Sequence, residues 1–173
     1  MNAPMDSPLF REAMSRLGAA VNLITTDGPA GRAGLTATAV CSVTDAPPTL
    51  LVCINRRSGS LATIMANGAL AINVLRAHHA GMAARFGNRS LAVDEKFAGG
   101  DWCFGESEPP FLGDALVSFL CHIASTVDVG SHCVMYCVVN RVHISDEDDG
   151  LFYFGRHYFG LSREKVSLPE QGA

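Results

Sequence analysis

The sequence predicts a mainly β domain, a small β-barrel with short helices. From residue 19 onward, runs rich in Val, Ile and Thr are separated by Gly, Pro, Asn and Asp, which is the pattern of short strands. Few segments show the helical spacing of apolar residues. The chain has 173 residues, of which 48% are hydrophobic. We therefore expect one domain over 1–173, with its core within about 10–160.

A helix is expected at the start of the chain. Ser7 is a suitable N-cap, and Pro8 fits the first turn. Apolar residues then recur at helical spacing from Leu9 to Leu17. Gly18 is expected to end this helix.

The remaining elements follow from apolar runs and the turns between them. We expect short helices near 59–67 and 77–86, a hairpin connection at 28–34 and an acidic turn at 145–150. Residues 87–101 are expected to be irregular, and the polar tail after Ser162 to be loose. Strands are expected near 19–27, 34–45, 49–55, 69–75, 100–104, 115–127, 133–144 and 151–154.

Composition excludes several classes of protein. The net charge of −4 does not favour binding to nucleic acid or to an anionic membrane. The N-terminal residues lack the pattern of a signal peptide, and no apolar run reaches the roughly 18 residues of a membrane span. The six cysteines form no Cys-x-x-Cys pair, so we expect reduced thiols in the cytoplasm and no metal site.

The run from Gly34 to Thr44 carries small side chains on both faces of its expected strand. Such a strand lets a flat ligand lie close to the backbone, where hydroxyls and main-chain amides can bond the ligand's heteroatoms. A Thr-rich strand packed under a neighbouring element is the simpler alternative, because β-branched residues are ordinary strand formers.

The apolar run that begins at Pro47-Pro48 predicts a strand buried on both faces. It leads into Asn55-Arg-Arg-Ser-Gly-Ser60, just before an expected helix. Hydroxyls, cations and free amides at this position suit a phosphate group. An ordinary capped helix with two surface arginines is the alternative.

Several other residues have both a functional and a structural interpretation. Arg85 and Phe86 close the second internal helix, either beside a site or as a surface cation and a core ring. His132 follows Gly130 at the start of a strand and either faces a pocket or is a structural histidine. His122 is expected in the core or at an interface, and His78 and His79 are expected to face solvent.

Motifs of several common enzyme classes are missing from the sequence. No Gly-x-Gly-x-x-Gly lies between a strand and a helix. Neither a Gly-x-Ser-x-Gly elbow nor a His-Glu-x-x-His occurs. The sequence therefore indicates neither a Rossmann cofactor site nor a standard hydrolase.

From about Phe10 to Tyr158 the chain resembles the short flavin reductases of two-component monooxygenases. It is most similar to the reductases that serve 4-hydroxyphenylacetate 3-monooxygenase and the pyrimidine-utilisation monooxygenase. The matching segments are Phe10–Met14, Gly18–Thr26, Thr36–Thr44, Pro47-Pro48, Cys53–Asn55, Ile72–Leu75, Gly130-x-His132 and Tyr153–Tyr158.

The resemblance implies an FMN-binding split barrel and a homodimer. It implies an enzyme in which NADH or NADPH reduces FMN or FAD, and a separate monooxygenase, acting on an aromatic or pyrimidine substrate, that receives the reduced flavin. The implied roles are phosphate binding near Ser58 and nicotinamide positioning by His132, with no acid or base required. The residues implied to bind or border the flavin are Thr36, Ala37, Thr38, Ala39, Cys53, Ile54, Asn55, Arg85 and Phe86.

The chain departs from the family at two positions. Many members carry Asp where this chain has Ser131, and Glu where it has Val138, so a charge relay to His132 is not expected. A flavin- or heme-binding protein of the same barrel type without turnover stays open as an alternative, as does a purely structural barrel. The motifs of pyridoxamine phosphate oxidases, which share this fold, do not occur.

Overall fold

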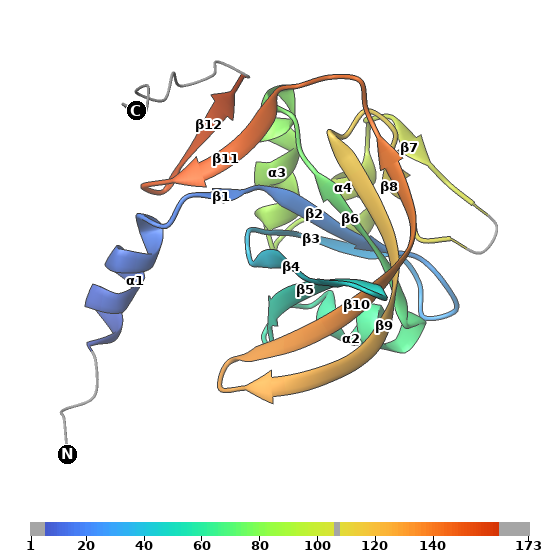
Figure 1. The fold of residues 1–173 in the computed structure, drawn as a ribbon, viewed down its shortest axis with the longest axis horizontal. Coiled ribbons are helices and arrows are strands. Elements are labelled where there is room, and N and C mark those ends of the chain that lie inside the picture. The colour runs from blue at the N-terminus through green and yellow to red at the C-terminus, as the bar shows by residue number, and fades with distance from the viewer. Residues whose placement is uncertain (1–5, 106–107, 163–173) are drawn as a thin grey trace, which may run out of the picture.

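A computed structural model describes residues 6–105 and 108–162. Its main sheet has seven antiparallel strands (Figure 1). Their order is β3 (Ala33–Ala37), β2 (Asn22–Thr26), β6 (Ala69–Val74), β9 (Val117–Val129), β10 (His132–Ile144), β5 (Pro48–Asn55) and β4 (Val40–Asp45). The predicted mainly β class is confirmed.

The two edge strands of this sheet, β3 and β4, are consecutive in the chain, with only Thr38 and Ala39 between them. The sheet must therefore curl until its opposite edges approach each other. Within the described residues no ladder pairs β3 with β4, so closure into the predicted β-barrel is not shown. The expected single strand over 34–45 is wrong. Its first half, β3, pairs with β2, and its second half, β4, pairs with β5. The two halves therefore lie at opposite edges of the sheet.

Two smaller sheets complete the β structure. One has the order β1 (Ala19–Ala20), β11 (Gly150–Phe154) and β12 (His157–Leu161), and the other pairs β7 (Trp102–Cys103) with β8 (Phe111–Leu112). The expected strand at 19–27 is thus divided between two sheets, and that at 100–104 is shorter than predicted. Strands β8 and β12 were not predicted. The acidic turn at 145–150 crosses from the main sheet to the second one.

The helices lie close to their predicted positions. They are α1 (Ser7–Ser15), α2 (Leu61–Asn67), the 3-10 turn η1 (Ala77–His79), α3 (Ala80–Gly87) and α4 (Val93–Phe97). Helix α4 lies in the segment expected to be irregular. Asp6, not Ser7, is the N-cap of α1, which ends before Gly18, at Ser15. No described helix is long and apolar enough to cross a membrane.

The core consists of two clusters. The first lies inside the curled sheet and is closed by Ile64 of α2. The second packs Phe86 of α3 and Phe97 of α4 against Leu23 and Leu151. Helix α1 belongs to neither cluster: it buries none of its residues and stands away from the body (Figure 1). The polar tail from residue 163 lies outside the described residues.

Candidate functional site

A cleft of about 280 Å³ opens where β3 ends and β4 begins. It lies between this connection, the end of β5, the loop after α3 and the first residue of β10. The residues that line it are Leu35, Thr36, Ala37, Thr38, Ala39, Cys53, Ile54, Asn55, Ser58, Phe86, Gly87, Arg89 and His132. The structure therefore brings together segments that are almost 100 residues apart in the sequence.

The connection between β3 and β4 offers unused main-chain donors. The Val40 amide donates to the Thr38 carbonyl, and the Cys53 amide donates to the Ala39 carbonyl, each at 3.0 Å. The amides of Thr38 and Ala39 themselves have no acceptor among the described residues. Because main-chain amides normally find a partner, these two N–H groups suit a ligand with acceptor atoms in the cleft.

Thr36 fixes the wall of the cleft, a role that the sequence did not indicate. Its hydroxyl donates to the Ala83 carbonyl of α3 at 2.6 Å, so its proton is not available to a ligand. Phe86 is buried and held by the rings of Phe97 and Trp102, at centroid distances of 5.0 and 5.7 Å. A Cβ at Gly34 would lie 2.6 Å from the Phe86 ring, so only glycine admits this close contact.

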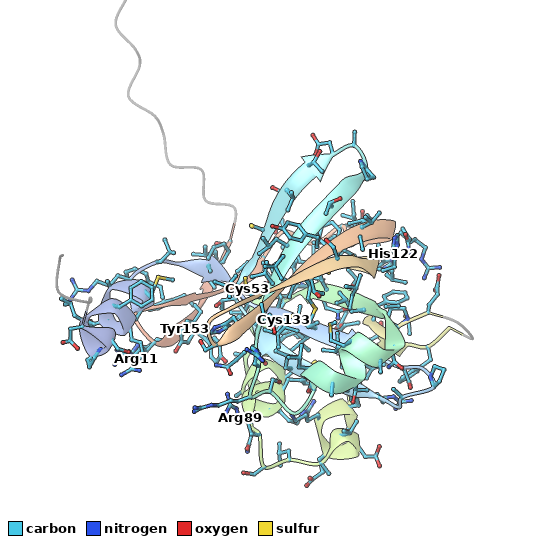
Figure 2. All side chains as sticks on the ribbon, turned by 90° about the horizontal axis from the view of Figure 1, so that it is seen from below. Arg11, Cys53, Arg89, His122, Cys133 and Tyr153 are labelled. Atoms are coloured by element: carbon cyan, nitrogen blue, oxygen red, sulfur yellow. The ribbon has the colours of Figure 1, made fainter. Side chains whose placement is uncertain are left out.

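Ser58 and Arg89 contribute polar side chains to the lining of the cleft. The Ser58 amide donates to the Asn55 carbonyl at 2.8 Å, which closes a turn and places the Ser58 side chain at the cleft. Arg89 has no ion-pair partner within residues 6–105 and 108–162. In Figure 2 its side chain projects from the loop after α3. A hydroxyl and an unpaired guanidinium suit a phosphate group.

Cys53, Asn55 and His132 also line the cleft. Asn55 and His132 are directly paired across β5 and β10. Burial raises the pKa of the Cys53 thiol, and the neighbouring Cys41 adds to this rise, so the thiol stays protonated and acts as a small wall residue. Ile54 is buried in the first core cluster, so it contributes little beyond its backbone.

A larger groove, of about 970 Å³, shares Thr38 and Ala39 with the cleft. It runs between α1, β4, β5 and β11, with Met14, Leu17 and Tyr153 among its apolar lining. Arg11 and Tyr153 mark its two sides in Figure 2. The lone chain therefore leaves an apolar groove open beside the cleft.

Comparison with known sequences decides the family. Residues 14–162 match the family described as flavin reductase like domain. The chain belongs to this family. It is 56% identical to FMN reductase (NADH) RutF 1 of Methylorubrum extorquens over 160 residues, which cover 92% of this chain and 79% of that one. It is 49% identical to FMN reductase (NADH) RutF of Stutzerimonas stutzeri over 161 residues, covering 93% and 92% of the two chains.

Solved structures agree with this assignment. BorF, the flavin reductase component of a bacterial two-component tryptophan halogenase, superposes with a TM-score of 0.85 at 25% identity, covering 92% of this chain and all of BorF. The predicted family and its enzyme class, an oxidoreductase of flavin reductase type, are confirmed.

Arg85 is the one predicted site residue that does not line the cleft. One helical step separates it from Phe86, so it leaves α3 in another direction. Its Nε is buried and has no partner among the described residues. The other expected cations, Arg56 and Arg57, also lie outside the cleft, and Arg56 is 3.5 Å from Asp128.

The arginine that lines the cleft is Arg89, which was not predicted from the sequence. Arg89 lies in the segment read as irregular. Nothing in the sequence separates it from the other surface arginines.

Two expectations about histidines are corrected. His79 is buried, not solvent-facing, and burial lowers its pKa. The Arg76 amide donates to His79 Nδ1 at 3.2 Å, so the ring proton lies on Nε2, 3.2 Å from the Asp114 carboxylate. A metal would need that nitrogen unprotonated, so the His78–His79–Asp114 cluster is built as a hydrogen-bond network. His122 was expected in the core or at an interface; it is exposed in the single chain and contacts Asn140, which excludes the core, and the interface stays a prediction.

Proposed function

We propose that this protein is an NADH-dependent FMN reductase that supplies reduced flavin to a separate monooxygenase. The observation that carries the proposal is the cleft at the β3–β4 connection. Its lining combines the unpartnered amides of Thr38 and Ala39 with the side chains of Ser58, Arg89 and His132. The names of the two relatives described above support FMN and NADH as the pair of reactants.

The cleft residues fit a flavin by their chemistry. The amides of Thr38 and Ala39 would donate to the carbonyl and nitrogen acceptors of the ring edge. The side chains of Ala37, Ala39 and Cys53 are small enough for the ring to lie against the strands. Ser58 and Arg89 would bind the phosphate, where a charge-assisted contact is stronger than a neutral one.

FMN, when bound, supplies the acceptor site for the hydride of NADH. The chain's own residues need only hold the two rings in contact, with the reacting atoms roughly 3–3.5 Å apart. The cleft wall, fixed by the Thr36–Ala83 hydrogen bond and the packing of Phe86, holds one ring. His132 would position the nicotinamide. No step requires an acid or base from the protein.

We also propose that the active form is a homodimer. The cleft of about 280 Å³ lies just below the roughly 300–1,000 Å³ of ligand pockets, so one chain covers only part of a flavin. Helix α1 buries no residue, and an isolated helix of nine residues is marginal in water. A second copy seated on α1 and the adjoining groove would stabilise that helix and close the cleft.

The enzyme that would receive the reduced flavin is inferred from related proteins. BorF serves a two-component tryptophan halogenase, which supports a separate flavin-dependent enzyme as the recipient. We propose a monooxygenase acting on an aromatic or pyrimidine substrate.

An oxidation assay tests the proposed reaction. NADH and NADPH are each supplied with FMN, FAD or riboflavin, and the loss of reduced nicotinamide is followed with and without the protein. We expect the highest kcat/KM with NADH and FMN. A protein that binds flavin but does not accelerate oxidation would support the alternative, a flavin- or heme-binding protein without turnover.

A further inference from the structure

The buried ring of His79 closes the 3-10 turn η1, which leads directly into α3. The His79 amide donates to the Arg76 carbonyl at 3.0 Å, and in return the Arg76 amide donates to His79 Nδ1 at 3.2 Å. Such a reciprocal pair satisfies two main-chain groups at the start of a helical segment. Because a main-chain N–H can only donate, Nδ1 is the acceptor, and it accepts only while the imidazole is neutral.

Three charged or titratable groups lie around this ring. Asp114, which follows β8, accepts from His79 Nε2 at 3.2 Å, and the exposed ring of His78 is 3.3 Å from the same carboxylate oxygen. The third group is the Arg76 side chain. Burial lowers the pKa of His79 and Asp114 opposes this effect, while the charges of His78 and Arg76 add to it. The fold therefore favours the neutral ring.

A second acceptor, Asp149, holds the start of η1. Its carboxylate accepts from the Ala77 amide at 2.9 Å and from Arg76 Nε at 2.8 Å, and Arg76 is also 3.1 Å from Glu147. A Cβ at Gly160 would lie 2.8 Å from the Cβ of Ala77, so η1 also packs closely against β12. Aspartate and arginine keep their charges near neutral pH, whereas a histidine ring can change its charge there.

The turn η1 sets the position of the cleft wall, because α3 begins at the residue after His79. The Ala83 carbonyl of α3 accepts the hydrogen bond from Thr36, and Phe86 of α3 lines the cleft. The close contact of the Phe86 ring with Gly34 leaves this wall little freedom to move. Phe86 lies about two helical turns beyond His79, so a displaced η1 would displace the wall.

We propose that His79 is a pH-sensitive switch of flavin binding, in which the neutral ring holds α3 in place as the cleft wall and the protonated ring releases it. A proton added at Nδ1 turns the acceptor into a donor that faces the Arg76 N–H, so that hydrogen bond is lost. Flavin binds the form with neutral His79, so acid weakens binding. This inference rests on the proposed function, because the ligand is the flavin of the cleft.

The test measures the affinity for riboflavin between pH 7.5 and 5.5 by fluorescence titration. Riboflavin is used because a phosphate monoester such as that of FMN itself takes up a proton near pH 6. We expect the wild-type affinity to fall about threefold to tenfold, since one titrating group changes an equilibrium by at most about tenfold per pH unit.

Two variants remove the titration at residue 79. His79→Asn keeps an acceptor near the position of Nδ1, and His79→Gln keeps a donor toward Asp114. Both side chains are neutral at every pH, so we expect the affinity of each variant for riboflavin to change less than twofold over this range. His78→Asn removes the adjacent exposed ring and is the matched control, which should keep the wild-type pH dependence.

The fluorescence of Trp102 gives a readout without ligand. It is the only tryptophan in the chain, and its ring packs on Phe86 and Phe97 at centroid distances of 5.7 and 4.8 Å. We expect the Trp102 emission to shift between pH 7.5 and 5.5 in the wild type and in His78→Asn, with the far-UV circular dichroism unchanged. In His79→Asn and His79→Gln the emission should stay constant.

Two results would overturn the inference. The first is a wild type whose Trp102 emission and riboflavin affinity do not change over this pH range. The second is an equal change in both variants of His79, which would assign the effect to another group, such as His132 in the cleft. A wild type that binds no flavin even at pH 7.5 would overturn the proposed function instead.

Discussion

The hydroxyl of Thr36 donates a hydrogen bond to the carbonyl oxygen of Ala83 at 2.6 Å and thereby joins β3 to α3 behind the cleft. Thr36→Val keeps the shape of the side chain but leaves that carbonyl without its donor. We expect the free energy of unfolding to fall by about 1 kcal/mol, the usual contribution of one hydrogen bond. Chemical denaturation measures the change, with Thr36→Ser as the control that keeps the donor. An unchanged stability together with lost FMN affinity would show that the hydroxyl serves the ligand instead.

The proposed phosphate contacts, Ser58 and Arg89, give a second prediction. Ser58→Ala and Arg89→Gln should each weaken FMN by about 1.5–3 kcal/mol, because each removes a contact to a charged group, and should leave riboflavin binding nearly unchanged. Fluorescence titration of both flavins measures this difference. Arg57→Gln is the matched control, since Arg57 does not line the cleft. Equal weakening of FMN and riboflavin would remove the residue concerned from the phosphate site.

The exposed apolar residues of α1 and of the turn that follows it give a third prediction. Met14 and Leu17 are 46% and 66% exposed in the single chain, so charge at these positions should leave the monomer's fold intact. We expect the wild type to sediment as a dimer at micromolar concentration and the double variant Met14→Glu, Leu17→Glu to sediment as a monomer with reduced activity. Val93→Glu, on α4, is the control that stays dimeric. A fully active wild-type monomer would contradict the homodimer.

Buried His79 predicts a pH dependence of stability. Burial lowers its pKa from the ordinary 6.5, so the unfolded chain binds more protons than the folded one below that pH. The free energy of unfolding should therefore decrease as the pH falls from about 7 to 5. Asp114, whose pKa is also lowered, acts in the same direction only below about pH 4. In His79→Gln the decrease between pH 7 and 5 should be smaller. An equal slope in both proteins would show that His79 does not cause it.

Much of the fold is predictable from local pattern. The alternation of Val, Ile and Thr with turn residues locates most strands, and Ser7-Pro8 marks the start of α1 to within one residue. The break at Thr38–Ala39 is not predictable in this way, because no turn residue interrupts the run from Gly34 to Thr44. The break is set by which strand each half pairs with, and this depends on the whole sheet.

The site is less predictable from residues alone. The small side chains of Ala37 and Ala39 indicate room for a flat ligand, but an ordinary packed strand has the same composition. Family resemblance was needed to group them with Ser58 and His132. The choice between Arg85 and Arg89 depends on where α3 ends and how the loop after Gly87 turns, which no local pattern specifies. The commitment of the Thr36 hydroxyl to Ala83 is likewise a tertiary contact.

The most direct test of the central claim follows reduction of FMN by NADH without oxygen, by loss of the visible absorbance of the flavin. Wild type is compared with Ala39→Trp, which fills the cleft from an exposed position. We expect the wild type to turn over FMN repeatedly, at a rate proportional to the protein concentration, and Ala39→Trp to lose this acceleration with its fold intact. A wild-type rate no greater than that of protein-free FMN and NADH would contradict the account, and an unaffected Ala39→Trp would place the reaction elsewhere.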